Sequence, residues 1–428
     1  MYQILMPARR AGLPVLLCSA AFSVALAAAE PPFVGSKQIS ATQLARAVLA
    51  RNPSLPAMQA AREAAEARIV QASALDDPMF SYTFAPATVG VSDLDFSQSF
   101  EISQALPWPG KRRMRGEAAQ HEAKAAHEGI DSQRLKLIAL AKSAFADWYF
   151  IHEAIRINRV NQDLLQEFRH ITETRYGTGL ASKQDALQAD VELNMLTHQA
   201  ILLERERREV LAAINKLVNR APDQALPAPA PLPAPVAPPD AAALRARAIN
   251  AQPELKILAA RIQSARARTD LAGREFYPDL ELVTGYDSFW DREEQRFTVG
   301  VGINIPLDRT KRRAAADEYR ALMKQAEWEL AEKRSALAGE VQRAYDRVQE
   351  TLQLLALHRE RLLPIAAENL EAAKADYAAG QGVFLALVTA EKNVMQTELG
   401  ERQSLADYHR RLAELERLVG GPLDEVKP

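Results

Sequence analysis

The sequence repeats itself once, so the fold must be built from two copies of one plan. The matched positions are Asn52-Pro53 with Gln252-Pro253, Asp77-Pro78 with Tyr277-Pro278, Pro107 with Pro306, Lys111-Arg112-Arg113 with Lys311-Arg312-Arg313, and Tyr176 and Gly179 with Tyr377 and Gly380. Their offset is 199 to 201 residues throughout. One period covers nearly half of the 428 residues, which excludes a solenoid of short repeats.

The repeat divides the chain into four segments. Residues 1–29 are typical of a secretory signal, with a basic start, an apolar stretch and small residues before Glu30. The first repeat is expected over 30–220 and the second over 240–428, with a linker at 221–239 that holds eight prolines and favours an extended connector. The only cysteine, Cys18, lies in the signal, and its acylation is left open.

Each copy follows the order helix, two strands, very long helix, turn, helix. Apolar residues make up 48% of the chain but aromatic residues only 6%, which favours long Ala- and Leu-rich helices packed as coiled coils. The spacing of apolar residues predicts a helix over 40–75, strands at 80–84, 94–103, 280–288 and 296–305, and an unbroken helix from Gly110 to Gly177. Such a helix is roughly 100 Å long. The fold class is therefore mainly α with a small β part.

The strands have alternating faces. Phe297, Val299, Val301, Ile303 and Ile305 share one face, whereas polar or small residues share the other. This pattern suits a membrane wall between lipid and water, although a soluble sheet with one buried face would also show it. Four strands cannot close a membrane wall alone, because every edge must be paired. Two chains would give eight strands and three would give twelve, with room for a channel.

The chain resembles the TolC family of outer-membrane efflux ducts, most closely the members that serve heavy-metal exporters of the resistance-nodulation-division (RND) type. The resemblance rests on the duplicated plan, on the stretch Ser103-Gln104-Ala105-Leu106-Pro107-Trp108-Pro109-Gly110-Lys111-Arg112, and on the Tyr-x-x-Gly turns at Tyr176–Gly179 and Tyr377–Gly380. It implies a homotrimer in the Gram-negative outer membrane, with one shared twelve-stranded β-barrel continued by a helical tunnel in the periplasm. It also implies an adaptor protein and an inner-membrane RND pump as partners.

Two groups of site residues follow from this topology. The junction between barrel and helices comprises Pro107, Trp108, Pro109, Gly110, Lys111, Pro306 and Lys311. Its basic triplets are expected to anchor near phospholipid headgroups, because a net charge of -2 speaks against a nucleic-acid surface.

The second group lies at the helical tips, which the resemblance makes the periplasmic entrance and adaptor-docking site. Its members are Tyr176, Gly177, Gly179, Asp185, Asp190, Tyr377, Gly380, Gly382 and Glu391. Asp185 and Asp190 would form acidic rings that attract cations in a trimer. The matching positions of the second repeat, Ala386 and Glu391, depart from this pattern, so a partly hydrophobic constriction and a merely solvated Asp185 stay open.

The pattern of titratable residues favours no chemistry. The seven histidines and the mature chain's lack of cysteine offer no metal-ligand spacing, and no nucleophile–base set can be proposed. We expect no enzyme activity, no cofactor and no resident metal. The alternatives are a periplasmic coiled-coil adaptor or scaffold, and a TolC-like duct for drugs or for type I secretion.

Overall fold

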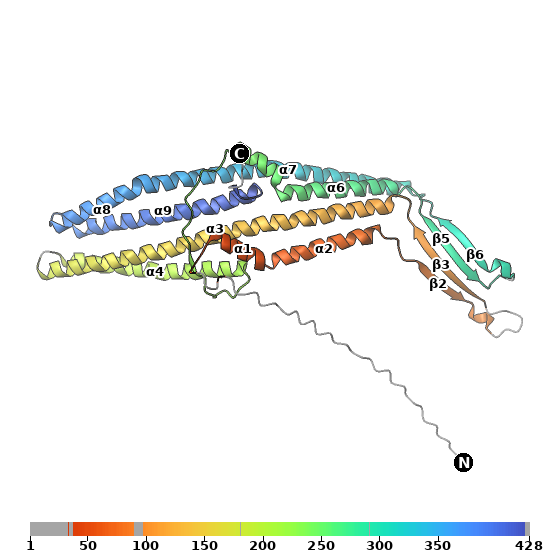
Figure 1. Ribbon diagram of the computed structural model, residues 1–428, viewed down its shortest axis with the longest axis horizontal. Coiled ribbons are helices and arrows are strands. Elements are labelled where there is room, and N and C mark those ends of the chain that lie inside the picture. The colour runs from red at the N-terminus through yellow and green to blue at the C-terminus, as the bar shows by residue number, and fades with distance from the viewer. Residues whose placement is uncertain (1–32, 34–36, 90–96, 180, 291, 424–428) are drawn as a thin grey trace, which may run out of the picture.

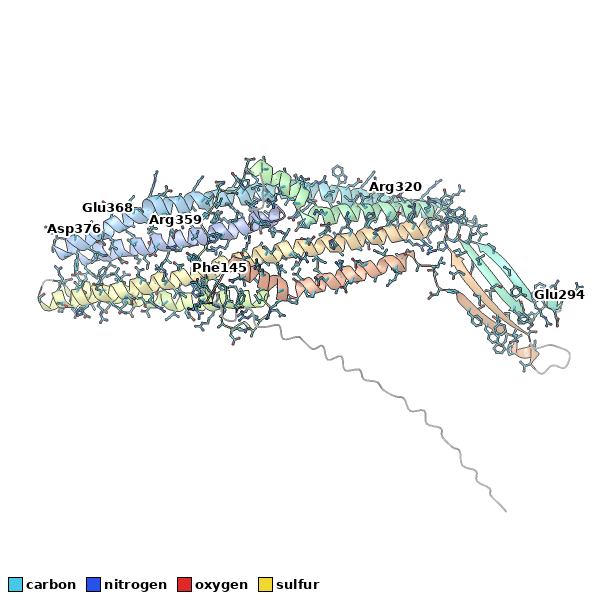
Figure 2. All side chains as sticks on the ribbon, viewed as in Figure 1. Phe145, Glu294, Arg320, Arg359, Glu368 and Asp376 are labelled. Atoms are coloured by element: carbon cyan, nitrogen blue, oxygen red, sulfur yellow. The ribbon has the colours of Figure 1, made fainter. Side chains whose placement is uncertain are left out.

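The computed structural model describes residues 33, 37–89, 97–179, 181–290 and 292–423. The predicted signal at 1–29, including Cys18, lies outside the described residues. The molecule is strongly elongated, with a β-sheet at one end and the tips of two helical hairpins at the other (Figure 1). Glu294 lies at the sheet end and Asp376 at the opposite end of the helices (Figure 2).

The two repeats have the same order of elements. The first contains β1 (Gln38–Ile39), α1 (Ala41–Arg51), α2 (Ser54–Ser73), β2 (Met79–Phe84), η1 (Pro86–Thr88), β3 (Gln98–Leu106), α3 (Lys111–Gly177) and α4 (Lys183–Leu217). After β4 (Ala228–Pro229), the second contains α5 (Ala241–Ala251), α6 (Pro253–Arg274), β5 (Leu280–Asp287), η2 (Glu293–Gln295), β6 (Phe297–Ile303), α7 (Arg309–Leu357), η3 (His358–Leu362), α8 (Leu363–Ala378) and α9 (Phe384–Leu418). The mainly helical, duplicated fold is confirmed.

Two predicted boundaries are wrong, and the two long helices differ in one respect. The helix expected over 40–75 is two helices, because Asn52 precedes a proline and adopts an extended conformation that ends α1. The strand expected at 94–103 continues to Leu106. The long helix of the second repeat contains a π-helical turn, η3, just before Pro364, whereas α3 runs unbroken for 67 residues.

The four longer strands form one antiparallel sheet in the order β2-β3-β5-β6. The pairing of β3 with β5 joins the two repeats, and β2 and β6 form its edges. One face is apolar and solvent-exposed in the single chain, with Phe80, Tyr82, Phe100, Val299 and Val301 among its members. The other face carries mostly polar or small residues, such as Ser81, Glu101 and Gly300. The predicted alternation is therefore confirmed.

The helical part is held by apolar clusters rather than by one central core. One cluster joins α1, α3 and α4 around Phe145 (Figure 2) and Trp148, which are each 1% exposed. A second joins α3, α4, α8 and α9 towards the tips, and a third joins α5, α7 and α9. None of the described helices is long and apolar enough to cross a membrane.

The proline-rich connector crosses the middle of the molecule from one repeat to the other (Figure 1). At its first end, β4 pairs in parallel with β1, and the Trp148 indole N–H donates to the Pro227 carbonyl at 3.0 Å. At its second end, the Tyr408 hydroxyl donates to the Val236 carbonyl at 2.7 Å and accepts from the Val236 N–H at 3.0 Å. The connector is thus fastened to both repeats by side chains of their long helices.

Tyr408→Phe should release the second end of the connector. It removes both hydrogen bonds to Val236, which together contribute about 1–3 kcal/mol. Hydrogen–deuterium exchange should show faster uptake in the peptide that contains Val236, with Tyr319→Phe on α7 as the control. Unchanged protection of Val236 in Tyr408→Phe would show that the hydroxyl does not hold the connector.

Candidate functional site

The junction between sheet and helices is organised by one buried lysine. Lys111 begins α3, and its side chain is only 1% exposed. Its ammonium group lies 2.9 Å from Asp279 Oδ1 and 3.2 Å from Glu275 Oε2, and it donates to the Tyr277 carbonyl at 3.0 Å. All three acceptors come from the segment between α6 and β5, so Lys111 ties the first repeat to the second.

Trp108 strengthens the same connection. Its backbone N–H donates to Asp279 Oδ1 at 2.7 Å, and its ring stacks on Tyr277 with 5.5 Å between centroids. Burial raises the pKa of Asp279, but the Lys111 ammonium and the Trp108 N–H outweigh it and hold the pKa below its usual value. Asp279 is therefore an ionised anchor for the start of α3.

Lys111 does not reach the headgroup region as the sequence predicted, because three oxygens of the protein surround it. Arg112 is also committed inside the protein, since its Nε donates at 2.9 Å to the carbonyl of Ser73, the last residue of α2. Arg312 repeats this contact on the carbonyl of Glu275, the C-cap of α6, at 2.8 Å. A cation at these carbonyls favours the helix ends. The headgroup-anchoring prediction is wrong for Lys111, whose side chain is buried, and it stays a prediction for Arg112, whose side chain is half-buried.

The second junction is built differently from the first. The Lys311 side chain is exposed, and its backbone N–H is capped by Asp308 Oδ1 at 2.9 Å. Pro306 lies in an apolar hollow with Ile303 and Ile305. In the first junction Pro107 ends the strand, Pro109 accepts from Arg274 Nη1 at 3.3 Å, and Gly110 has a φ of +97° that favours glycine. The predicted junction residues thus form one internal site, centred on Lys111, and one exposed site.

The two helical tips are joined by Arg175. Its guanidinium lies 4.8 Å from the centroid of the Tyr377 ring, and its Nη1 donates to the Tyr377 carbonyl at 2.9 Å. Gly179 and Gly380 follow the helices with φ values of +77° and +74°, and end them with left-handed residues. Gly177 is the last residue of α3, Gly382 bonds back to the Asp376 carbonyl, and Tyr176 is half exposed.

The predicted acidic residues of the tips have separate surroundings. Asp185 forms a capping box with Ser182 at the start of α4, and Asp190 pairs with Arg169 at 2.9 Å between Oδ1 and Nε. Glu391 is 7% exposed, its Oε2 has no hydrogen-bond partner among the described residues, and burial raises its pKa. The structure therefore gives Asp185 and Asp190 local partners and places Glu391 in the packing between helices.

Sequence reasoning missed the residues that make these contacts. Asp279 and Tyr277 flank Pro278, one of the matched prolines, so the repeat contained a signal for them. The carboxylate of Asp279 has no counterpart in the first repeat, where Met79 matches it, and the ring of Tyr277 has none either, since Asp77 matches it. This difference distinguishes the Lys111 junction from the other one. Arg175 lies directly before Tyr176, but nothing in its spacing predicted contact with the other tip.

Lys111→Met should destabilise the protein by about 3–5 kcal/mol, because it leaves Asp279 without its partner in a partly buried site. The denaturation midpoint of the detergent-solubilised protein measures this effect. Lys124→Met, at an exposed position of α3, is the control and should change stability by less than about 0.5 kcal/mol. Equal midpoints for the two variants would contradict the anchoring role of Lys111.

Comparison with known proteins agrees with this architecture. The family model described as outer membrane efflux protein matches residues 44–220 and 244–421, one match for each repeat. The pyoverdine export outer membrane protein OpmQ of Pseudomonas aeruginosa is 24% identical over 290 residues, which cover 66% of this chain and 59% of that protein. The alkaline protease secretion protein AprF of the same organism is 22% identical over 310 residues, covering 70% of this chain and 64% of that protein.

The fold is also that of a solved channel. The outer-membrane channel OprN superposes with a TM-score of 0.76 at 19% identity, covering 92% of this chain and 94% of OprN. The two family matches, one on each repeat, agree with the internal duplication. The chain belongs to the outer membrane efflux protein family, whose members are passive channels of the outer membrane and not enzymes.

Proposed function

We propose that three copies of this chain form one outer-membrane duct for efflux. The observation that carries this proposal is the sheet: four strands with an apolar outer face and two edges, β2 and β6, that no other strand of the described chain pairs. Membrane strands must have every edge paired, so the edges need further copies. Three copies supply twelve strands, and the resulting barrel is wide enough for a channel.

The repeat also predicts how the edges meet. Within the chain, β3 pairs with β5 so that Ile102 faces Thr284. The second-repeat equivalent of β3 is β6, at an offset of 199, and the first-repeat equivalent of β5 is β2, at an offset of 200. The same pairing between two chains therefore places Val301 of one protomer opposite Phe84 of the next.

Cysteine cross-linking tests this pairing. The mature chain is expected to lack cysteine, so Phe84→Cys combined with Val301→Cys introduces one pair at each interface. Mild oxidation in membranes should give covalent trimers on a non-reducing gel. In the control variant, Thr83→Cys with Val301→Cys, the two cysteines lie on opposite faces of the sheet. This variant should therefore run as monomers on the same gel. Monomers in both variants would contradict the closed trimer.

The tips, at the end opposite the sheet, would form the periplasmic entrance and the docking site of the adaptor. Asp185, Asp190 and Glu391 would then line or support this entrance in three copies. An inner-membrane RND pump would supply the energy, and the adaptor would connect that pump to the duct. The cargo first suggested by the resemblance is heavy-metal cations, tested by the metal sensitivity of a deletion strain. Increased sensitivity to drugs alone, or loss of a secreted protein, would instead support the other cargo classes.

Arg175→Ala should open the entrance. The variant removes a hydrogen bond and a cation–π contact between the two repeats, together about 1–2 kcal/mol. Single-channel conductance in planar bilayers should therefore rise. Arg205→Ala is a matched control, because Arg205 pairs with Glu209 on an exposed face of α4, away from the tips. A conductance that rises equally in both variants would contradict a specific role of the contact between tips.

A further inference from the structure

A hollow of about 790 Å³ lies next to the junction, on the helical side. It is lined by four helices that pack side by side in the order α2, α3, α6, α7. Each helix contributes one arginine: Arg68, Arg115, Arg268 and Arg312. The wall between them consists of small and apolar residues, mostly alanine, with the ring of Tyr319.

The helical period of α7 shows which side the hollow faces. Arg309 and Arg313 share a separate hollow with Ile303 and Ile305, where the apolar face of the sheet meets the helix. The residues of α7 that line the arginine hollow are Arg312, Ala315 and Tyr319, and on average they lie about 100° around the helix from Arg309 and Arg313. The arginine hollow therefore opens on a different side of α7 from the apolar hollow, and in the proposed duct this side faces the interior.

The first repeat agrees with this orientation. Arg113, the counterpart of Arg313, is well exposed, and Arg115 lies two residues further on in the hollow. A separation of about 200° places Arg113 and Arg115 on opposite sides of α3. Arg113 and Arg115 thus provide an outward and an inward arginine on one helix turn.

Positive charge exceeds negative charge in the hollow. Its carboxylates are Glu122, which pairs with Arg268, and Glu275, which lies 3.8 Å from Arg115 and also binds Lys111. Arg312 donates to the backbone carbonyls of Glu275 and Asp308, which carry no charge. Arg68 has no carboxylate partner among the described residues. Guanidinium groups with free N–H donors bind carboxylate, sulfonate and phosphate groups well.

We propose that this hollow is a binding site for amphipathic organic anions in transit through the duct. The arginines hold the anionic group, and the alanine wall with Tyr319 contacts the apolar body of the ligand. The inference rests on the proposed duct and specifies its cargo class: three copies place twelve arginines around the interior beside the junction. Such a belt raises the local concentration of anions and works against free metal cations.

The polar face of the sheet carries charge of the opposite sign. Glu101, Glu281 and Asp287 lie on that face, and they would line the barrel beyond the hollow. Overall ion selectivity therefore combines both regions and does not isolate the hollow. Block of the conductance by a bulky anion reports on the hollow alone, because the block depends on how long the anion stays bound there.

Planar-bilayer recordings of the purified full-length protein test the proposal. The probe is 1,5-naphthalenedisulfonate, and methyl viologen is the aromatic cation for comparison. The anion should block the wild type at lower concentration than the cation. Arg68→Gln with Arg268→Gln should raise the half-blocking concentration of the anion roughly tenfold or more, since two charged hydrogen-bond donors are lost. Arg113→Gln, an outward arginine, should leave it unchanged.

Each result separates the hollow from the duct. A wild type without conductance contradicts the duct itself. A conducting wild type that the anion does not block, or a double variant blocked like the wild type, overturns the anion site alone. A half-blocking concentration of the anion that rises as much in Arg113→Gln as in the double variant also overturns the anion site. Arg68→Gln by itself, which breaks no ion pair, should weaken the block in the same direction and guards against misfolding of the double variant.

Discussion

Backbone hydrogen bonding at the edges of the sheet is the constraint on which the whole architecture depends. β2 and β6 each present a row of N–H and C=O groups, and the apolar face beside them belongs in lipid. In that medium an unpaired backbone group costs several kcal/mol. In the duct that we propose, the single chain therefore supplies one third of the barrel wall.

The two repeats share a plan but divide their tasks unequally. In the first repeat Lys111 is buried and binds the second repeat, whereas Lys311 is exposed. The long helix α3 is continuous, whereas a π-helical turn, η3, separates α7 from α8 in the second repeat. The two junctions thus have different chemistry, although the two repeats follow the same backbone plan.

Local sequence patterns predict much of the fold but few of the contacts at the candidate site. The alternation of apolar and polar residues predicts the strands. The absence of proline between Gly110 and Gly177 predicts α3 to within one residue of its observed bounds. Proline explains the boundary that was missed at Asn52. By contrast, the burial of Lys111 depends on Asp279 and Glu275, which lie more than 160 residues away in the sequence. Periodicity cannot reveal such a pair, because both partners are ordinary charged residues at the ends of elements. The contact of Arg175 with Tyr377 was missed for the same reason.

The fastening of the proline-rich connector has a consequence for how the chain reaches its final structure. Its partner Tyr408 lies 172 residues after Val236, near the end of the last helix. Contacts at such a separation form late, since the loop between them must first be ordered. The first repeat is synthesised before the second, so the second end of the connector cannot be fastened until the last helix has formed. We therefore expect the hydrogen bonds between Tyr408 and Val236 to form among the last steps of folding. Only a chain that is complete through its last helix can then hold the connector in place.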